Sequence, residues 1–258
     1  MRKVAPWVVW LGLVIGLAGP AAVLLAVLGR LTGTMDWQTA FVTLTVRTAP
    51  PLAMAGVAAG VVALIAAFWA RPRWLFAVAA TALIAPALTL AGFAGLRAQA
   101  ARVPPIHDVA TNWEEPVNFS DRLLRLRGSD ANPVEPNPSL DEPWRPAGTA
   151  VRESWAAQRV ADLNRLTCPG ARPVGRLVPE AEVRRALEAE GVEILGAAPW
   201  RVEGVWRSTW FRFPDDVAVR MRPGRTDVRS VSRYGQSDLG QNCARVTRIV
   251  QALERGGA

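Results

Sequence analysis

Three long apolar runs without a charged residue restrict this chain more than any other feature. They are Trp7–Leu28, Pro51–Trp69 and Trp74–Leu96, each about 19 to 23 residues long. A helix of that length crosses the roughly 30 Å hydrocarbon core of a bilayer and satisfies its own backbone hydrogen bonds there. The runs therefore predict three transmembrane helices within residues 1–96. Buried helices of a soluble protein are the alternative, and three uncharged runs disfavour it.

Glycine pairs inside the first two runs indicate how the helices pack. Gly12 and Gly16 are four residues apart, and so are Gly56 and Gly60. Small residues at this spacing let helix backbones approach closely, so we expect them to pack the three helices together. Residues 35–50, between the first two runs, are partly apolar. We expect them either to rest on the membrane surface or to form a short helix.

Basic residues indicate the orientation in the membrane. Lys and Arg near the helix ends divide equally between the two sides, but the link ARPR (70–73) is tight and basic, and the chain starts with MRK. Short basic segments stay in the cytoplasm. We therefore expect a bacterial inner-membrane protein with a cytoplasmic N-terminus and a periplasmic C-terminal domain. If the first run is instead a cleaved signal peptide, that domain still lies outside.

Charge is distributed differently in the rest of the chain. Residues 1–96 contain one acidic and six basic residues, whereas the remainder contains 21 acidic residues and 24 arginines. The signs are interleaved and nearly balanced there. A nucleic-acid-binding protein needs a concentrated basic stripe, so we expect no nucleic acid among the partners.

A proline-rich stretch separates the helices from a small C-terminal domain. The segment PVEPNPSLDEPWRP (133–146) has five prolines in fourteen residues. Such a segment excludes a helix or a central strand. We interpret residues 97–150 as a linker and domain entry, and residues 151–258 as an extracytoplasmic domain.

The C-terminal domain shows both helical and strand periodicity. Residues 179–190 have a helical apolar face, and a second helical stripe runs from Leu239 to Leu253. Four segments are expected to be strands, three of them because apolar residues recur at every second position. They are residues 192–197, 201–213, 216–222 and 226–233.

Turns between these strands predict the sheet. PDD (214–216) and PGR (223–225) are typical hairpin turns. The strands then form an antiparallel meander with the two helices on one face. The predicted fold class is three transmembrane helices plus an α+β two-layer domain.

The last sixty residues of this pattern resemble the domain of unknown function 1499 family. The resemblance covers roughly residues 104–255 and rests on PPIHDV, WFRFPDDVAVRMRP and TDVRSVSRYGQSDLGQNCARV. It implies a membrane-tethered domain and no known reaction. The short PGRT loop and the cysteines depart from the family pattern. The motif residues map onto Phe213, Asp215, Asp216, Arg220, Asp227, Arg229, Ser230, Ser232, Arg233, Gly235, Ser237, Asp238, Gly240, Asn242 and Arg245.

The densest polar stretch, residues 232–246, allows two interpretations. In the structural one, Ser237 or Asp238 caps the last helix and the arginines pair with aspartates. In the functional one, the helix start and nearby arginines form a recognition surface for a partner or polar ligand. Asp238 would repel an anion at that position. The candidate binding residues are Arg220, Arg229, Arg233, Ser237, Asp238, Asn242 and Arg245.

Catalytic and metal chemistry have weaker support. His107 is the single histidine, and a hydrolase would use it with Asp215 or Asp216. One His and two Cys do not supply a four-ligand zinc site, and no cofactor-binding motif is present, so we expect no metal and no cofactor. Cys168 and Cys243 are the two cysteines. In an oxidising compartment they favour a disulfide, and two separate core thiols are the alternative.

Three functions remain open from the sequence. The first is a non-enzymatic envelope protein whose partners are the lipid bilayer and a protein or lipid held near it. The second is a module that binds a small ligand or lipid. The third is a hydrolase using Asp215 or Asp216 with His107.

Overall fold

The computed structural model describes residues 3–135 and 158–256. The chain divides into two compact units. The first unit is Met1–Ala98 with Thr209–Arg212, and the second is Gln99–Ser208 with Phe213–Ala258. Each unit is described by itself.

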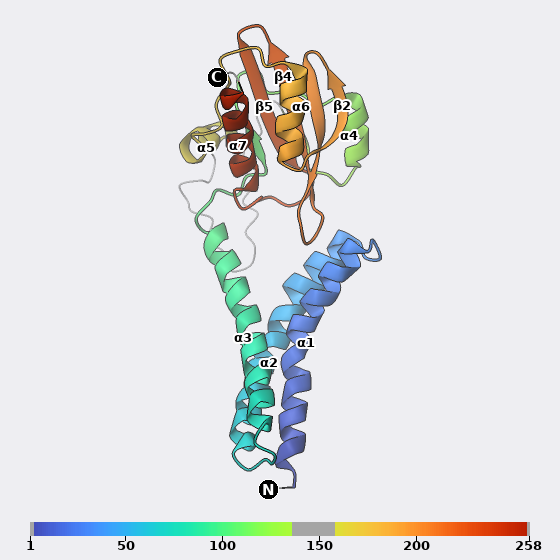
Figure 1. Ribbon diagram of the computed structural model, residues 1–258, viewed down its shortest axis with the longest axis vertical. Helices are drawn as coiled ribbons and strands as arrows, with labels where there is room; N and C mark the ends of the chain where they lie inside the picture. The colour runs from blue at the N-terminus through green and yellow to red at the C-terminus, as the bar shows by residue number, and fades with distance from the viewer. Residues whose placement is uncertain (1–2, 136–157, 257–258) are drawn as a thin grey trace. The chain divides into compact units, whose positions relative to one another are not determined.

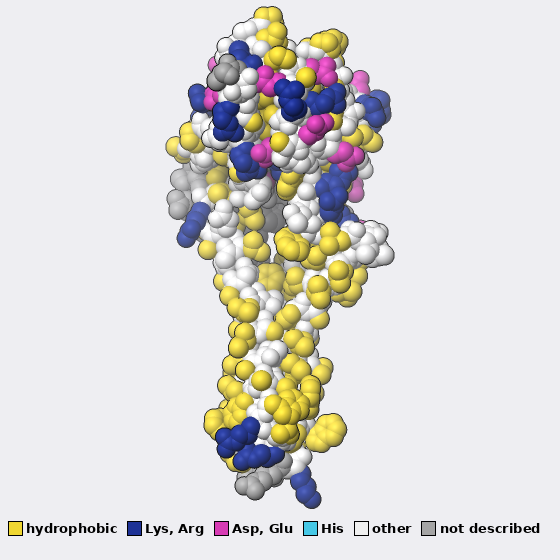
Figure 2. All heavy atoms as spheres, in the orientation of Figure 1, with side chains coloured by type: hydrophobic (Ala, Val, Ile, Leu, Met, Phe, Trp, Pro, Cys, Tyr) yellow, Lys and Arg dark blue, Asp and Glu magenta, His cyan; other side chains and the backbone are white. Residues whose placement is uncertain are grey.

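The first unit consists of long apolar helices (Figure 1). They are α1 (Ala5–Leu31), a π-helix η1 (Gln38–Thr48) that continues into α2 (Ala49–Ala67), and α3 (Leu75–Ala100). By length and composition, three helical spans are long and apolar enough to cross a membrane. Figure 2 shows apolar side chains over these helices, with charged side chains gathered on the second unit.

The second span begins earlier than the sequence predicts. Instead of a surface segment or a short separate helix at residues 35–50, the chain is helical from Gln38 onward. Asp36 accepts the Thr39 N–H at 2.8 Å and thereby helps to start the helix. Pro50 and Pro51 lack N–H donors, which interrupts the regular α-helical bonding just before α2. We attribute the wider π-helical turns to this interruption.

Close helix packing in the first unit depends on glycine. A Cβ added at Gly60 of α2 would lie 2.7 Å from the carbonyl oxygen of Ala82 and 2.6 Å from the Cα of Leu83, both in α3. Gly92, also in α3, would place a Cβ in open space. The predicted role of Gly60 in packing therefore has a direct steric basis.

Nine elements form the second unit. Five are strands, namely β1 (Asp108–Ala110), β2 (Glu193–Ala198), β3 (Arg201–Arg207), β4 (Pro214–Arg222) and β5 (Arg225–Ser232). Four are helices, namely α4 (Asp121–Arg127), α5 (Val160–Thr167), α6 (Glu180–Ala189) and α7 (Gln241–Arg255).

The strands form one antiparallel sheet in the order β1-β5-β4-β3-β2. Strands β2 to β5 are the predicted meander, with Val202 opposite Val219 and Val217 opposite Ser230. The predicted α+β class with an antiparallel sheet and three membrane-type helices is confirmed. Strand β1 adds to the far edge beside β5, with Val109 opposite Ser230. Strand β1 and α4 make residues 108–127 an integral part of the domain, whereas we had assigned them to the linker.

Two cores lie on opposite faces of the sheet. Helices α6 and α7 lie side by side over one face (Figure 1), where Val202, Val217 and Leu253 belong to the larger core. On the other face, Val205 and Ala218 pack against Phe119 and Leu123 from α4 and the loop before it. The buried strands alternate between these two cores, as period-two patterning requires.

One predicted turn is wrong. The strand predicted at 201–213 ends at Arg207, and the residues predicted as the turn PDD begin β4. The hairpin turn is Ser208–Phe213, closed by a Ser208 N–H bond to the Phe213 carbonyl at 2.9 Å. Proline is tolerated as the first residue of a strand. Most of the predicted proline-rich linker falls in residues 136–157, which lie outside the described residues.

Prediction: Gly60→Ala destabilises the first unit, because the added methyl group meets the α3 backbone. Overpacking of this kind costs about 1–3 kcal/mol. Gly92→Ala, the matched control, is neutral or stabilising by up to about 1 kcal/mol, since alanine is the better helix former. The measurement is the thermal midpoint of the full-length protein in detergent, followed by circular dichroism. Equal midpoints for the two variants would contradict the packing interpretation.

Candidate functional site

A buried ion pair joins β1 to β5. Nε of Arg229 donates to Oδ1 of Asp108 at 3.0 Å, and its Nη2 donates to Oδ2 at 2.5 Å. Both side chains are almost completely buried. The remaining guanidinium protons reach the carbonyl oxygens of Val117 (3.3 Å) and Glu135 (2.6 Å). Two-pronged pairing and carbonyl bonds are what a buried arginine needs.

Asp216 holds two further arginines on the same face. It accepts from Nε and Nη2 of Arg233, at 3.1 Å and 2.7 Å, and it also pairs with Arg127 of α4. The Asp216 side chain is fully buried. Burial lowers the pKa of Arg127, and the Asp216 carboxylate opposes that change. Asp216 therefore fastens α4 and the end of β5 to the sheet.

The neighbouring Asp215 points to the opposite face, because successive strand residues alternate. Its Oδ2 lies 2.9 Å from Nη2 of Arg245 in α7. Arg245 also donates to Oγ of Ser230 at 2.9 Å and to Oδ1 of Asn242 at 2.5 Å, and its guanidinium lies over the Trp206 ring at 4.1 Å. Burial raises the pKa of Asp215, and Arg245 opposes the change.

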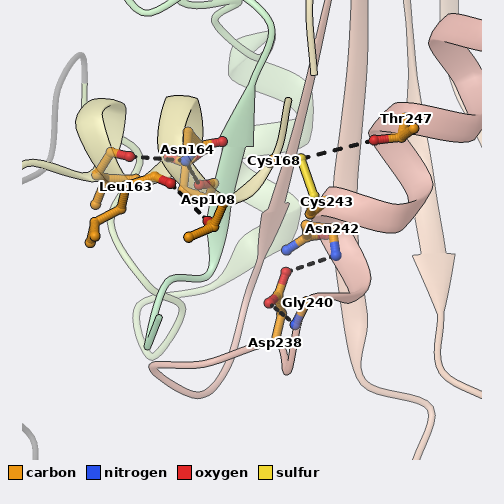
Figure 3. Close-up of a disulfide and its surroundings, with 11 residues drawn as sticks. Asp108, Leu163, Asn164, Cys168, Asp238, Gly240, Asn242, Cys243 and Thr247 are labelled. Carbon is orange, nitrogen blue, oxygen red and sulfur yellow. Dashed lines mark hydrogen bonds between the residues drawn. A yellow bond between two sulfur atoms is a disulfide. The ribbon is translucent and has the colours of Figure 1, made fainter. Parts of the chain in front are cut away.

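Asp238 organises the start of α7. Its two oxygens accept the N–H groups of Gly240 and Asn242, each at 2.7 Å (Figure 3). Gly240 adopts φ 85°, a conformation that glycine tolerates. Burial raises the pKa of Asp238 to about 6, against the two hydrogen bonds that lower it. The prediction that Ser237 or Asp238 caps this helix is thus realised mainly by Asp238.

A disulfide lies beside this turn. Cys168, after α5, is joined to Cys243 in the first turn of α7 (Figure 3). These are the two residues that the sequence predicts to pair. The bond ties together segments 75 residues apart in the sequence.

A partly exposed charge cluster occupies the β4–β5 hairpin. Asp227, which is buried, receives Arg220 at 3.2 Å, Arg222 at 3.3 Å and Arg225 at 2.9 Å. Glu115 also pairs with Arg220 and Arg222, at 3.3 Å and 2.7 Å. Hydrogen bonding to Glu115 raises the pKa of Arg222.

The predicted binding residues therefore fall into two groups. Arg229, Arg233, Arg245 and Asn242 are buried and bonded to other parts of the domain. Arg220, Ser237 and Asp238 are partly exposed. A recognition surface at the exposed group stays a prediction, whereas the buried group does what the structural interpretation describes.

The hydrolase alternative loses its carboxylates. Asp215 is occupied by Arg245, and Asp216 is occupied by Arg127 and Arg233. His107 bonds to the backbone of Gln236, and burial lowers its pKa. Within residues 3–135 and 158–256, no group of three or more His, Cys, Asp or Glu side chains is placed to hold a metal ion.

Sequence reasoning missed several residues of this arrangement. Asp108 and Arg127 are ion-pair partners that come from the segment assigned to the linker. A signal for Asp108 was present, since it follows His107 in the quoted motif PPIHDV. Trp113 and Asn164, which line a cavity, carried no recognisable signal.

Prediction: Asp238 makes stability depend on pH. Its pKa is about 6 in the folded state, against an ordinary value of 3.8. The folded state holds the proton more tightly, so this contribution is present below about pH 4 and is lost as pH rises to about 6. Asp238→Asn keeps one acceptor oxygen and does not titrate. Thermal midpoints measured from pH 4 to 7 should show wild type losing stability relative to Asp238→Asn, and the opposite trend would contradict the assignment.

Comparison with known proteins gives one family. A search of curated proteins found no match, and a search of solved structures found none. The family model described as "Protein of unknown function (DUF1499)" matches residues 108–253. These residues are more than half of the chain, and they run from the first residue of β1 into α7. The chain belongs to the DUF1499 family.

Proposed function

We propose that this DUF1499 protein is a non-catalytic binding protein whose second unit is tethered to the bacterial inner membrane and lies in the periplasm. The observation that carries the proposal is the use of charge in the domain. Asp108, Asp215 and Asp216 are all committed to buried arginines. A domain that uses these carboxylates to hold its own sheet does not offer them as general bases. Binding is then its available activity.

The disulfide supports a periplasmic location. Such bonds persist in oxidising compartments and are rare in the cytoplasm. The apolar helices supply the tether, with the bilayer as one partner. The basic link at 70–73 favours a cytoplasmic N-terminus.

A protein or lipid held near the membrane is the proposed second partner. Arg220, Ser237 and Asp238 are the candidate contact residues that remain partly exposed. Arg220 is a better probe of such contact than Arg229, because Arg229 is fully buried and its removal would disturb the domain itself.

Binding of a small ligand is the second candidate function. It is favoured by one specific observation. Trp113 and Asn164 line one cavity, and each has a buried polar atom without a hydrogen-bond partner.

Prediction: alkaline phosphatase fused to the C-terminus of the full chain is active, and a fluorescent protein fused there is dark. The reason is that phosphatase needs periplasmic disulfides, whereas the fluorescent protein matures in the cytoplasm. Fusions made directly after Arg73 should give the reverse result, since the 70–73 link is expected inside.

The same cells provide a second readout. Cys168 and Cys243 should resist alkylation until a reductant is added. A fluorescent C-terminal fusion with freely alkylated cysteines would overturn the proposed location.

A further inference from the structure

A cavity of about 290 Å³ lies within the second unit, outside the ion-pair network. Its walls come from the loop after β1, from α5 and from the first residue of β5. This volume is at the lower end of the range for ligand sites, so the cavity suits a small molecule. The lining residues used below are Trp113, Glu114, Asn164, Arg165 and Arg225.

Two side chains of the cavity have unmet hydrogen-bonding capacity. Nε1 of Trp113 is a buried donor without a partner, and Oδ1 of Asn164 is a buried acceptor without one. Trp113 is 8% exposed and Asn164 is 2% exposed. Buried polar groups in folded proteins are nearly always satisfied, by the protein, by water or by a ligand. Two such groups on one cavity therefore point to a missing molecule.

Both groups are held in place by their surroundings. Nδ2 of Asn164 donates to the carbonyl oxygens of Asp108 (3.1 Å) and Val160 (3.0 Å). Turning the amide would break both bonds, so Oδ1 must remain the unpaired atom. The Trp113 ring faces the guanidinium of Arg229 at 5.5 Å, and Arg229 is itself fixed by Asp108. The donor and the acceptor are thus preorganised.

Charged residues of the cavity indicate the sign of the ligand. Arg165 and Arg225 are basic, and Glu114 is acidic. Arg165 pairs with exposed Asp162 at 3.1 Å, which is a weak surface interaction. Nε of Arg225 is bonded to Asp227, and the side chain is 39% exposed. An arginine fork has further donors that match a carboxylate.

We infer that this cavity binds a small hydroxylated carboxylate. Its hydroxyl groups accept from Nε1 of Trp113 and donate to Oδ1 of Asn164, because a hydroxyl is both donor and acceptor. Its carboxylate interacts with Arg165 or Arg225. The inference rests on the second candidate function and does not depend on the location of the domain.

The test uses full-length, disulfide-intact protein in detergent with D-glucuronate as probe. Titration calorimetry and thermal midpoints are compared for glucuronate, for glucose, which lacks the carboxylate, and for acetate, which lacks the hydroxyls. We expect glucuronate to bind and to raise the midpoint, glucose to bind more weakly and acetate to have no effect. An equal effect of acetate, or no effect of glucuronate, overturns the inference.

Trp113→Phe keeps the ring and removes the N–H alone. We expect about tenfold weaker glucuronate binding, the effect of losing one hydrogen bond, with no loss of midpoint in the free protein. Trp200→Phe is the matched control, because Trp200 is 63% exposed and does not line the cavity. It should bind like wild type. If Trp113→Phe lowers the midpoint of the free protein and leaves binding unchanged, a buried water satisfies the indole and the inference fails.

The two proposals fail in distinguishable ways. A fluorescent C-terminal fusion would remove the periplasmic location while leaving glucuronate binding intact. Loss of glucuronate binding with an active phosphatase fusion would remove the ligand and keep the location.

Discussion

Buried arginines on both faces of a five-stranded sheet are the constraint on which the domain depends. A guanidinium cannot be left unpaired in a protein interior, because its desolvation costs several kcal/mol. Asp108, Asp215 and Asp216 supply the charges that meet this requirement. Asp215 and Asp216 are adjacent in β4, so the strand alternation sends one to α7 and the other to α4. Two neighbouring residues thereby fasten helices on opposite sides of the sheet.

This use of charge limits the chemistry that the domain can perform. Carboxylates bonded to two arginines, as Asp216 is, stay ionised and engaged. Asp238 differs, because it holds backbone N–H groups at the start of α7 and its pKa is raised to about 6. The unmet polar atoms lie elsewhere, in the cavity lined by Trp113 and Asn164. Structural charge and binding capacity are therefore separated within one domain.

Much of the architecture was predictable from local patterns, and the exceptions have physical reasons. Apolar length identified the membrane-type helices, and period-two alternation identified β3 to β5. Asp215 and Asp216 looked like a turn because strands are poor in aspartate. Distant arginines make them acceptable there, and that compensation is invisible locally. Strand β1 has three residues, too few to show a period. The cavity depends on how segments meet in space, which no local pattern describes.

The most direct test of the central claim is a double-mutant cycle on Asp108 and Arg229. The free energy of unfolding of the domain is measured in urea for Asp108→Ala, for Arg229→Met and for the double variant. Each single change should cost about 3–5 kcal/mol, because it leaves the partner charged and buried, and the double change should cost well below the sum. Additive costs would contradict the account, since they would mean that the pair does not hold β1 to the sheet.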